Sequence, residues 1–243
     1  MMPKNVKYVF KYKPLYVLES IYYIKDWLIK YIKTSNCKGF MLDSGAFTFM
    51  GNSKVKKGYN IDWQKYMINY ADYINTHKIK LFFEMDMDNV IGYDNVKILR
   101  KELELRTKTK CIPVWHKDRG KEEFIKLCKN YDYIAIGGIV SKEITKKDYK
   151  YFKWFIDTAH DNNCQIHGLG FTPTRILHKY QFDSVDSTNW TGGQRYGRMY
   201  KVIGNRIYEI KTENKKTINK GYLLTQKHNL QEWIKFQKYM EKI

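Results

Sequence analysis

Short apolar runs alternate along the chain with longer amphipathic segments. The segment Ile61–His77 repeats apolar residues at helical spacing, and the segments Asp94–Thr107, Lys121–Asn130 and Lys147–His160 do the same. Six short runs between and around these helices have the composition of buried strands: Gly39–Asp43, Leu81–Asp86, Cys111–His116, Tyr133–Gly138, Gln165–Gly170 and Phe182–Asp186. Strands that alternate with helices predict a parallel β-sheet.

Two weaker runs, near Val6–Tyr12 and Arg206–Lys211, would raise the number of strands to eight and close a barrel. Periodicity alone does not separate a closed barrel from an open, doubly wound sheet. Polar residues and glycines at the strand ends favour the barrel, because active sites of (β/α)8 barrels lie at that edge, whereas an open sheet has one crevice. We predict an α/β protein with a single (β/α)8 barrel domain over residues 1–243, including a basic C-terminal segment from about 195 to 243.

Composition bounds the class of protein. Hydrophobic residues make up 43% and charged residues 28% of the 243 residues, which is typical of a globular domain. No apolar run approaches the roughly 18–20 residues of a membrane span, and the first residues lack a signal-peptide pattern. We therefore expect a soluble, cytoplasmic protein. The scattered cysteines Cys37, Cys111, Cys128 and Cys164 are interpreted as packing residues, and we expect neither a metal nor a cofactor.

The formal net charge of +19 favours a polyanionic partner, because lysines and arginines that neutralise phosphates release condensed counterions. A bias towards Lys, Ile, Asn and Tyr, or solubility alone, is the alternative explanation. The excess is partly local, since Glu209 and Glu213 are the acidic residues among eight basic ones between positions 195 and 220: Arg195, Arg198, Lys201, Arg206, Lys211, Lys215, Lys216 and Lys220.

A carboxylate followed by small residues ends the strand Gly39–Asp43. In Asp43-Ser44-Gly45, the small residues leave room for a planar ligand, and Ser44 has a hydroxyl to donate. A strand-to-helix turn in which Asp43 caps backbone amides explains the same residues. Taken alone, the motif favours this structural turn.

Five motifs in order resemble those of the tRNA-guanine transglycosylases. They are Asp43-Ser44-Gly45-Ala46-Phe47, Phe83-Glu84-Met85-Asp86, Pro113-Val114-Trp115-His116, Ile136-Gly137-Gly138-Ile139 and Phe182-Asp183-Ser184-Val185-Asp186-Ser187. The resemblance implies that Asp43 lies in the base pocket and moves protons, and that Asp86 reads the base. It places His116 where the family has a base-contacting glutamine. The predicted contacts to the base also include Ser44, Gly45, Gly137, Gly138, Ile139 and Gly168.

The nucleophile has two possible registers in the last motif. The family pattern of Asp, any residue, apolar residue and Asp makes Asp186 the nucleophile that attacks C1′ of the sugar. A shifted match would assign that role to Asp183. We favour Asp186 because it ends the strand and is followed by a polar loop with glycines, Ser187–Gly193.

The chain departs from the tRNA enzymes in lacking a cysteine-rich zinc subdomain, since no cysteine follows Cys164. Its pattern is more similar to the phage and bacterial branch that inserts 7-deazaguanines into DNA. The resemblance thus implies exchange of guanine in duplex or locally opened DNA for a free 7-deazaguanine base. Exchange in tRNA, hydrolysis of nucleosides and a non-catalytic nucleic-acid-binding barrel remain alternatives.

Residues after the nucleophile strand are candidates for holding the nucleic-acid backbone: Trp190, Gln194, Arg195 and Arg198. A solvated basic loop is the alternative. His116 is a candidate base contact or proton carrier, and a structural role fits it equally well. For His167 we favour a structural or phosphate-facing role.

Overall fold

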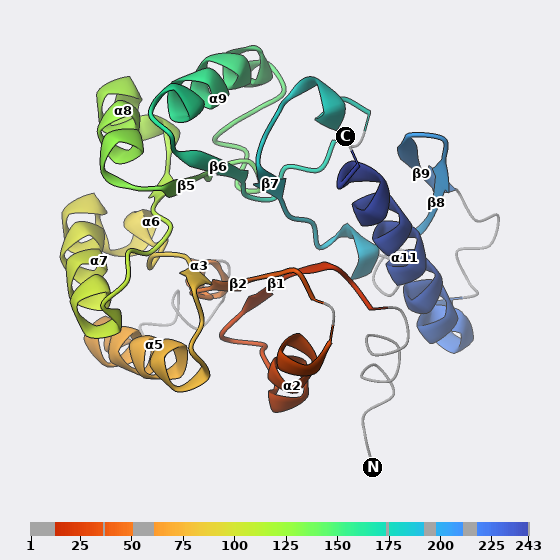
Figure 1. Cartoon of the computed structure of the whole chain (residues 1–243), viewed down its shortest axis with the longest axis horizontal. Helices are drawn as coiled ribbons and strands as arrows, with labels where there is room; N and C mark the ends of the chain where they lie inside the picture. Colours follow the sequence, from red (N-terminus) through yellow and green to blue (C-terminus); the bar gives the residue numbers. More distant parts are fainter. Residues whose placement is uncertain are drawn as a thin grey trace.

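The computed structural model describes residues 13–35, 37–50, 61–173, 175–191, 198–210 and 218–242, which form a mixed α/β protein (Figure 1). The predicted strand near Val6–Tyr12 lies outside these residues. The parallel strands are β1 (Tyr16–Ser20), β2 (Gly39–Asp43), β3 (Leu81–Phe82), β4 (Val114–Trp115), β5 (Tyr133–Ile136), β6 (Gln165–Gly168) and β7 (Ser184–Val185). No helix in the described ranges has the length and apolar character to cross a membrane.

These strands form two small parallel sheets, in the orders β1-β2-β3 and β4-β5-β6-β7. A single parallel bridge between Phe83 and Ile112 lies where the two sheets meet. Within each sheet the strand order follows the chain order, and the strand beside β2 at the sheet's edge is Tyr16–Ser20, which was not predicted from the sequence. The described residues do not show a closed eight-stranded barrel.

The eighth predicted strand is wrong as a barrel strand. Arg206–Ile210 is a strand, β9, but it pairs antiparallel with β8 (Met199–Ile203) in a separate hairpin. The sequence Gly204-Asn205 supplies the turn, and Gly204 adopts a positive φ of 60° that suits glycine. The hairpin packs on the C-terminal helix α11 (Ile218–Met240), on the opposite side of the molecule from α7 and α8 (Figure 1).

The four predicted helices are confirmed within a few residues, by α5 (Trp63–His77), α7 (Tyr93–Thr107), α8 (Gly120–Asn130) and α9 (Phe152–Asp161). The remaining helical segments are α2 (Asp26–Thr34), α3 (Phe47–Met50), α6 (Asp88–Ile91) and the 3-10 turns η1 (Lys117–Arg119), η2 (Asp148–Tyr151), η3 (Leu177–Lys179) and η4 (Asn189–Thr191). In α5, Asp62 caps the first turn by accepting a hydrogen bond from the Lys65 amide at 2.9 Å. The apolar stripe of α5 is buried, as its spacing predicts.

Helix α11 covers the outer edge of β1. The Gln237 side chain accepts from the Leu15 amide at 3.2 Å and donates to the Tyr16 carbonyl at 2.8 Å, much as a neighbouring strand would. Glu241, one turn further along, pairs with Lys38 and accepts from the Tyr16 hydroxyl. An amide side chain thus satisfies backbone groups that a strand edge leaves open.

A buried carboxylate joins the two parallel sheets. Glu84 directly follows the bridge residue Phe83, is fully buried, and accepts a hydrogen bond from the Val114 amide of β4 at 2.7 Å. Its other oxygen pairs with Arg100 of α7, and Arg119 of η1 approaches at 3.4 Å. The guanidinium groups are themselves buried, so all three charges depend on one another.

Glu84→Gln should therefore destabilise the fold strongly. Glutamine keeps the volume but removes the charge that compensates Arg100 and Arg119, and breaking such a buried pair costs about 3–5 kcal/mol. Urea denaturation followed by circular dichroism measures the free energy of unfolding.

The matched control is Glu102→Gln, which breaks the exposed pair between Glu102 and Arg106. An exposed pair of this kind contributes less than about 1 kcal/mol. Equal losses for the two variants would contradict the assigned role of Glu84.

Candidate active site

Asp43 ends β2 and bends the chain into the following loop. Its Oδ2 accepts a hydrogen bond from the Gly45 amide at 3.0 Å, so the aspartate does make the turn that the sequence allowed. Gly45 has a φ of 73°, and a Cβ there would lie 2.8 Å from Ser20 Oγ. Only glycine therefore fits between the loop and the end of β1.

Three carboxylates from different strand ends meet around Asp43. The pKa of Asp43 is raised from its ordinary value to about 6. Burial of the carboxyl group is the largest cause, and the negative charges of Asp86 and Asp186 add to it. The end of β2 and the segments that follow β3 and β7 thus place Asp43, Asp86 and Asp186 near enough for their charges to interact. A carboxyl group with a pKa near 6 can hold and release a proton at neutral pH.

Asp186 is held through one oxygen. Its Oδ1 accepts from the Gly170 amide at 2.5 Å and lies 3.3 Å from Nε2 of the buried His167. Behind the imidazole, Nδ1 lies 2.5 Å from Ser184 Oγ, which in turn contacts the Tyr133 hydroxyl at 2.5 Å. When Tyr133 donates to Ser184 and Ser184 to Nδ1, His167 carries its proton on Nε2 and donates to Asp186. Both of these contacts are to Oδ1, and no described residue forms a hydrogen bond or ion pair with the other oxygen, Oδ2.

Asp183 lies apart from this group. Its Oδ2 accepts from the Ile166 amide at 2.8 Å and lies 3.0 Å from Nε2 of His160 on α9. The carboxylate therefore helps to hold β6, β7 and α9 together.

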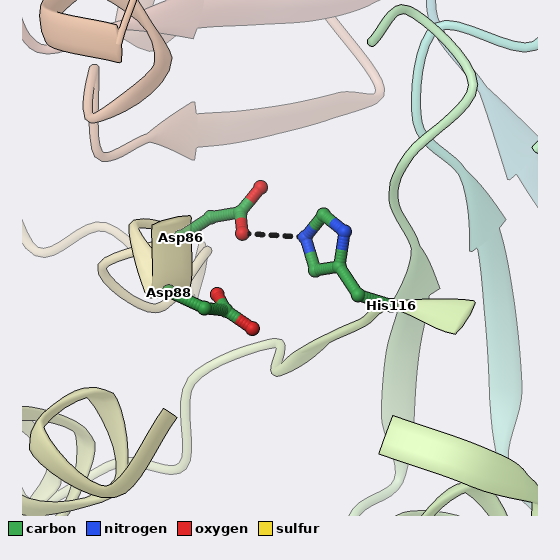
Figure 2. Close-up of side chains that lie close together, drawn as sticks. All are labelled: Asp86, Asp88 and His116. Carbon is green, nitrogen blue, oxygen red and sulfur yellow. Dashed lines mark hydrogen bonds and ion pairs between the residues drawn. The ribbon is translucent and has the colours of Figure 1, made fainter. Parts of the chain in front are cut away.

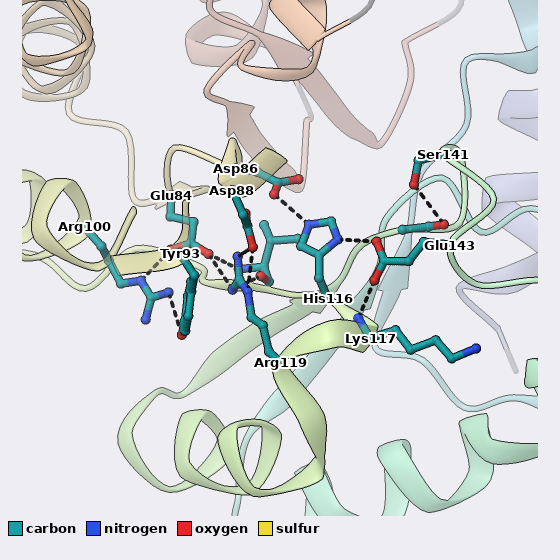
Figure 3. Close-up of polar contacts among 12 residues, drawn as sticks. Glu84, Asp86, Asp88, Tyr93, Arg100, His116, Lys117, Arg119, Ser141 and Glu143 are labelled. Atoms are coloured by element: carbon teal, nitrogen blue, oxygen red, sulfur yellow. Dashed lines mark hydrogen bonds and ion pairs between the residues drawn. The ribbon is translucent and has the colours of Figure 1, made fainter. Parts of the chain in front are cut away.

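His116 lies between two carboxylates at the end of β4. Its Nε2 is 2.7 Å from Asp86 Oδ1 and its Nδ1 is 2.9 Å from Glu143 Oε2 (Figure 3). Burial alone lowers the pKa of His116, but the hydrogen bonds to the two carboxylates outweigh it and raise that pKa to about 10. The imidazolium therefore donates to both neighbours, and Asp86 acts as an acceptor.

The two glycines after β5 make room for this arrangement. A Cβ on Gly137 would lie 2.7 Å from the His116 ring, and one on Gly138 would lie 2.8 Å from Glu143 Oε2. The Gly137 amide donates to the Trp115 carbonyl within the sheet, so it cannot also bind a base. Among the described residues, the amides of Gly138 and Ile139 form no hydrogen bond, which leaves them available for the predicted contact.

Two other predicted base contacts are packed inside the protein. The Ser44 side chain is fully buried, and its hydroxyl has no partner in the described part of the chain. Gly168 is packed against Phe171 and Val185, where an added Cβ would lie 3.0 and 3.2 Å from their side chains. Neither position is open to solvent in this structure.

The predicted nucleic-acid contacts are only partly placed. Trp190 is half-buried in η4, where its carbonyl accepts from Asn229 of α11 at 3.3 Å. Arg198 is exposed and pairs with Glu209 at 3.5 Å. Gln194 and Arg195 lie outside the described residues.

Asp86, Asp88 and His116 could in principle hold a metal ion. Each offers one ligand atom, and these atoms lie within 4.8 Å of one another (Figure 2). Cationic side chains of the protein already pair with both carboxylates, since His116 binds Asp86 and Arg119 binds Asp88. An ion would have to displace the proton from His116 Nε2 and compete with Arg119, although Asp88 Oδ1 is buried without a partner.

Sequence reasoning missed Glu143 and placed His167 outside the site. Glu143 lies in an irregular loop after Gly137-Gly138, where no periodic pattern marks it. His167 alternates with Ile166 along β6, so its inward direction could have been inferred once Asp186 was placed on the adjacent strand. Both residues orient a group that the motifs did identify.

No protein-family model matches this sequence, and no characterised protein matches it significantly. Function must therefore be inferred from the chemistry of these residues together with the motifs in the sequence.

Asp43→Asn should make stability less dependent on pH. The folded-state pKa of about 6 lies above the ordinary 3.8, so the unfolded chain loses its proton first and the stability of the parent falls between about pH 4 and pH 6. Asparagine cannot ionise and still accepts from Gly45. The difference in unfolding free energy, Asn variant minus parent, should rise by up to about 3 kcal/mol from pH 4 to pH 7.

Denaturation in urea at several pH values measures this difference. Asp72→Asn, which removes an exposed carboxylate from α5, corrects for the general effect of a lost negative charge. A difference for Asp43→Asn that stays constant with pH would rule out the inferred proton affinity.

Proposed function

We propose that this protein exchanges a purine base in nucleic acid through a covalent sugar–enzyme intermediate, with guanine in DNA as the outgoing base and a free 7-deazaguanine as the incoming one. The observation that carries the proposal is the meeting of Asp43, Asp86 and Asp186, which come from separate strands and act on one proton site. Such a cluster costs stability, and costly clusters of titratable groups are typical of catalytic sites. The motifs around these residues support the same reaction.

Asp186 is the proposed nucleophile. His167 and Gly170 bind its Oδ1, which fixes the carboxylate and leaves Oδ2 to attack C1′ of the sugar. As the new C1′–O bond forms, the bond from C1′ to N9 of guanine breaks, and its electron pair leaves with the base. The product is a sugar ester of Asp186.

Asp43 is the proposed proton carrier. In its protonated form it gives a proton to the departing guanine, and as a carboxylate it then takes the N9 proton of the incoming 7-deazaguanine. That nitrogen attacks C1′ and expels Asp186, so the second step reverses the first. The pKa of about 6 allows both forms near neutral pH.

Asp86 is the proposed reader of the base. His116 donates to its Oδ1, which keeps the carboxylate an acceptor for the amide and amino hydrogens on the edge of guanine. Glu143 fixes the other nitrogen of His116 and thereby the direction of the imidazolium. A base without those donors would leave the second oxygen of this buried carboxylate, Oδ2, without a partner, which penalises binding of that base.

The fold proposed for this reaction is a (β/α) barrel built on the seven parallel strands. Their sequential order and the bridge between Phe83 and Ile112 support a continuous array. The net charge of +19 supports a nucleic-acid substrate, and the absence of any cysteine after Cys164 favours DNA over the tRNA route of the zinc-containing relatives. A base within a duplex must leave the stack to reach such a site.

Asp186→Asn should abolish base exchange, because an amide oxygen is a far poorer nucleophile than a carboxylate. Asp183→Asn is the matched control, since it removes a carboxylate from the other end of the same strand, where Asp183 binds the Ile166 amide and His160. The measurement is incorporation of radiolabelled guanine into DNA and, in parallel, into tRNA.

We expect the parent and Asp183→Asn to incorporate guanine into DNA and not into tRNA. Asp186→Asn should incorporate it into neither. An active Asp186→Asn with an inactive Asp183→Asn would reassign the nucleophile to the other register. Incorporation into tRNA alone would change the substrate, and release of guanine without incorporation would indicate a hydrolase.

Exchange should survive treatment with a chelator such as EDTA, because every proposed step uses side chains of the chain itself. Activity that is lost on chelation and restored by Zn²⁺ or Mn²⁺ would instead make Asp86, Asp88 and His116 metal ligands.

A further inference from the structure

A cavity lies between η2, the segment that follows β6, and the β8–β9 hairpin with α11. Its volume is about 760 Å³, which is within the range of ligand-binding clefts. The active-site residues Asp43, Asp86 and His116 do not line it. It is therefore a separate feature of the surface that the proposed chemistry leaves unexplained.

The lining of this cleft is basic. Lys146, Lys150, Arg175 and Arg198 contribute four cationic side chains, and Glu209 is the acidic residue among the lining positions. Lys146, Lys150 and Arg175 are exposed, and within the described ranges none of them forms an ion pair. A cleft of this kind attracts phosphate groups.

Aromatic side chains also line the cleft. Tyr180 and Tyr208 are half-buried, so part of each side chain is open to solvent, and Trp233 of α11 lines the cleft with them. Rings of this kind can stack on unpaired bases, and the combination of a basic groove with aromatic residues is typical of single-strand binding surfaces.

The cleft reaches the residue next to the proposed nucleophile. Thr172 and Asn189 both line it, and each binds Ser187: the Thr172 hydroxyl lies 3.0 Å from Ser187 Oγ, and the Asn189 amide donates to the same oxygen at 3.1 Å. Ser187 directly follows Asp186. A strand lying in the cleft would thus lead directly to the sugar that Asp186 attacks.

We propose that this cleft binds a short single-stranded DNA segment that adjoins the exchanged nucleotide, with phosphates on Lys146, Lys150, Arg175 and Arg198 and bases against the aromatic side chains. The inference rests on the proposed function for its choice of DNA. One turn of a double helix is about 34 Å long, so a duplex is too large to enter a cleft of about 760 Å³. The site therefore requires DNA that is locally opened.

Binding is tested with a fluorescently labelled single-stranded oligonucleotide that contains guanine, by anisotropy at several salt concentrations. All proteins carry Asp186→Asn, so no chemistry is needed. The cleft variant is Lys146→Gln with Arg175→Gln. The control variant, Lys101→Gln with Lys129→Gln, removes the same charge from exposed positions on α7 and α8, on the other side of the molecule.

The cleft variant should reduce the slope of log K against log salt by about 1.4, because each phosphate contact on a single strand contributes about 0.7. At 0.1 M salt this corresponds to roughly 25-fold weaker binding if the two proteins converge at 1 M. The control should change affinity less than about threefold. Tyr208→Ala should weaken binding at least about fivefold without changing the slope, since stacking releases no counterions.

Equal losses in the cleft and control variants, or no binding of the oligonucleotide at all, would overturn the proposal. Tighter binding of a matched duplex than of the single strand would also overturn it. Weakened binding in the cleft variant together with no base exchange by the parent protein would leave the cleft standing while the proposed reaction fails. The two failures are therefore distinguishable.

Discussion

The buried carboxylate of Glu84 is the constraint on which the site depends. It lies where the β1-β2-β3 and β4-β5-β6-β7 sheets meet, and it binds the backbone of β4 as well as arginines from α7 and η1. Asp86, two residues after Glu84 in the chain, belongs to the cluster of Asp43, Asp86 and Asp186. Arg119 pairs with both Glu84 and Asp88 (Figure 3). The positions of Asp86 and His116 therefore depend on a buried ion-pair network next to them in the chain.

Charge is distributed unevenly in this molecule, and that distribution links the site to its surroundings. The chain carries a large positive excess, yet carboxylates gather at the strand ends and are matched locally by His116, Arg100 and Arg119. Asp43 forms no ion pair within the described ranges, and its burial, together with the negative charges of Asp86 and Asp186, raises its proton affinity. Because some carboxylates are paired with cationic side chains and others are not, neighbouring carboxylates differ in proton affinity.

The sequence predicted what periodicity and strand ends can encode. The helix over Ile61–His77 follows from the local spacing of its apolar residues. Asp43, Asp86 and Asp186 were singled out by their positions at strand ends together with the resemblance of their motifs to a known family, because the carboxyl ends of parallel strands lie at one edge of a sheet. The hairpin of β8 and β9 was not predicted, because one apolar run near Arg206 is compatible with parallel or antiparallel pairing. Glu143 was not predicted either, since its partner His116 is distant in sequence and its loop has no repeat.

The contact between Gln237 and β1 has a consequence for how the chain folds during synthesis. The Leu15 amide and its side-chain partner are 222 positions apart, so a ribosome must make nearly all of the described chain before the edge of β1 is covered. Until then the nascent protein exposes an open strand edge, the feature through which partly folded chains pair with one another. Helix α11 is synthesised after all seven parallel strands, and it covers the edge of the one that was made before the other six.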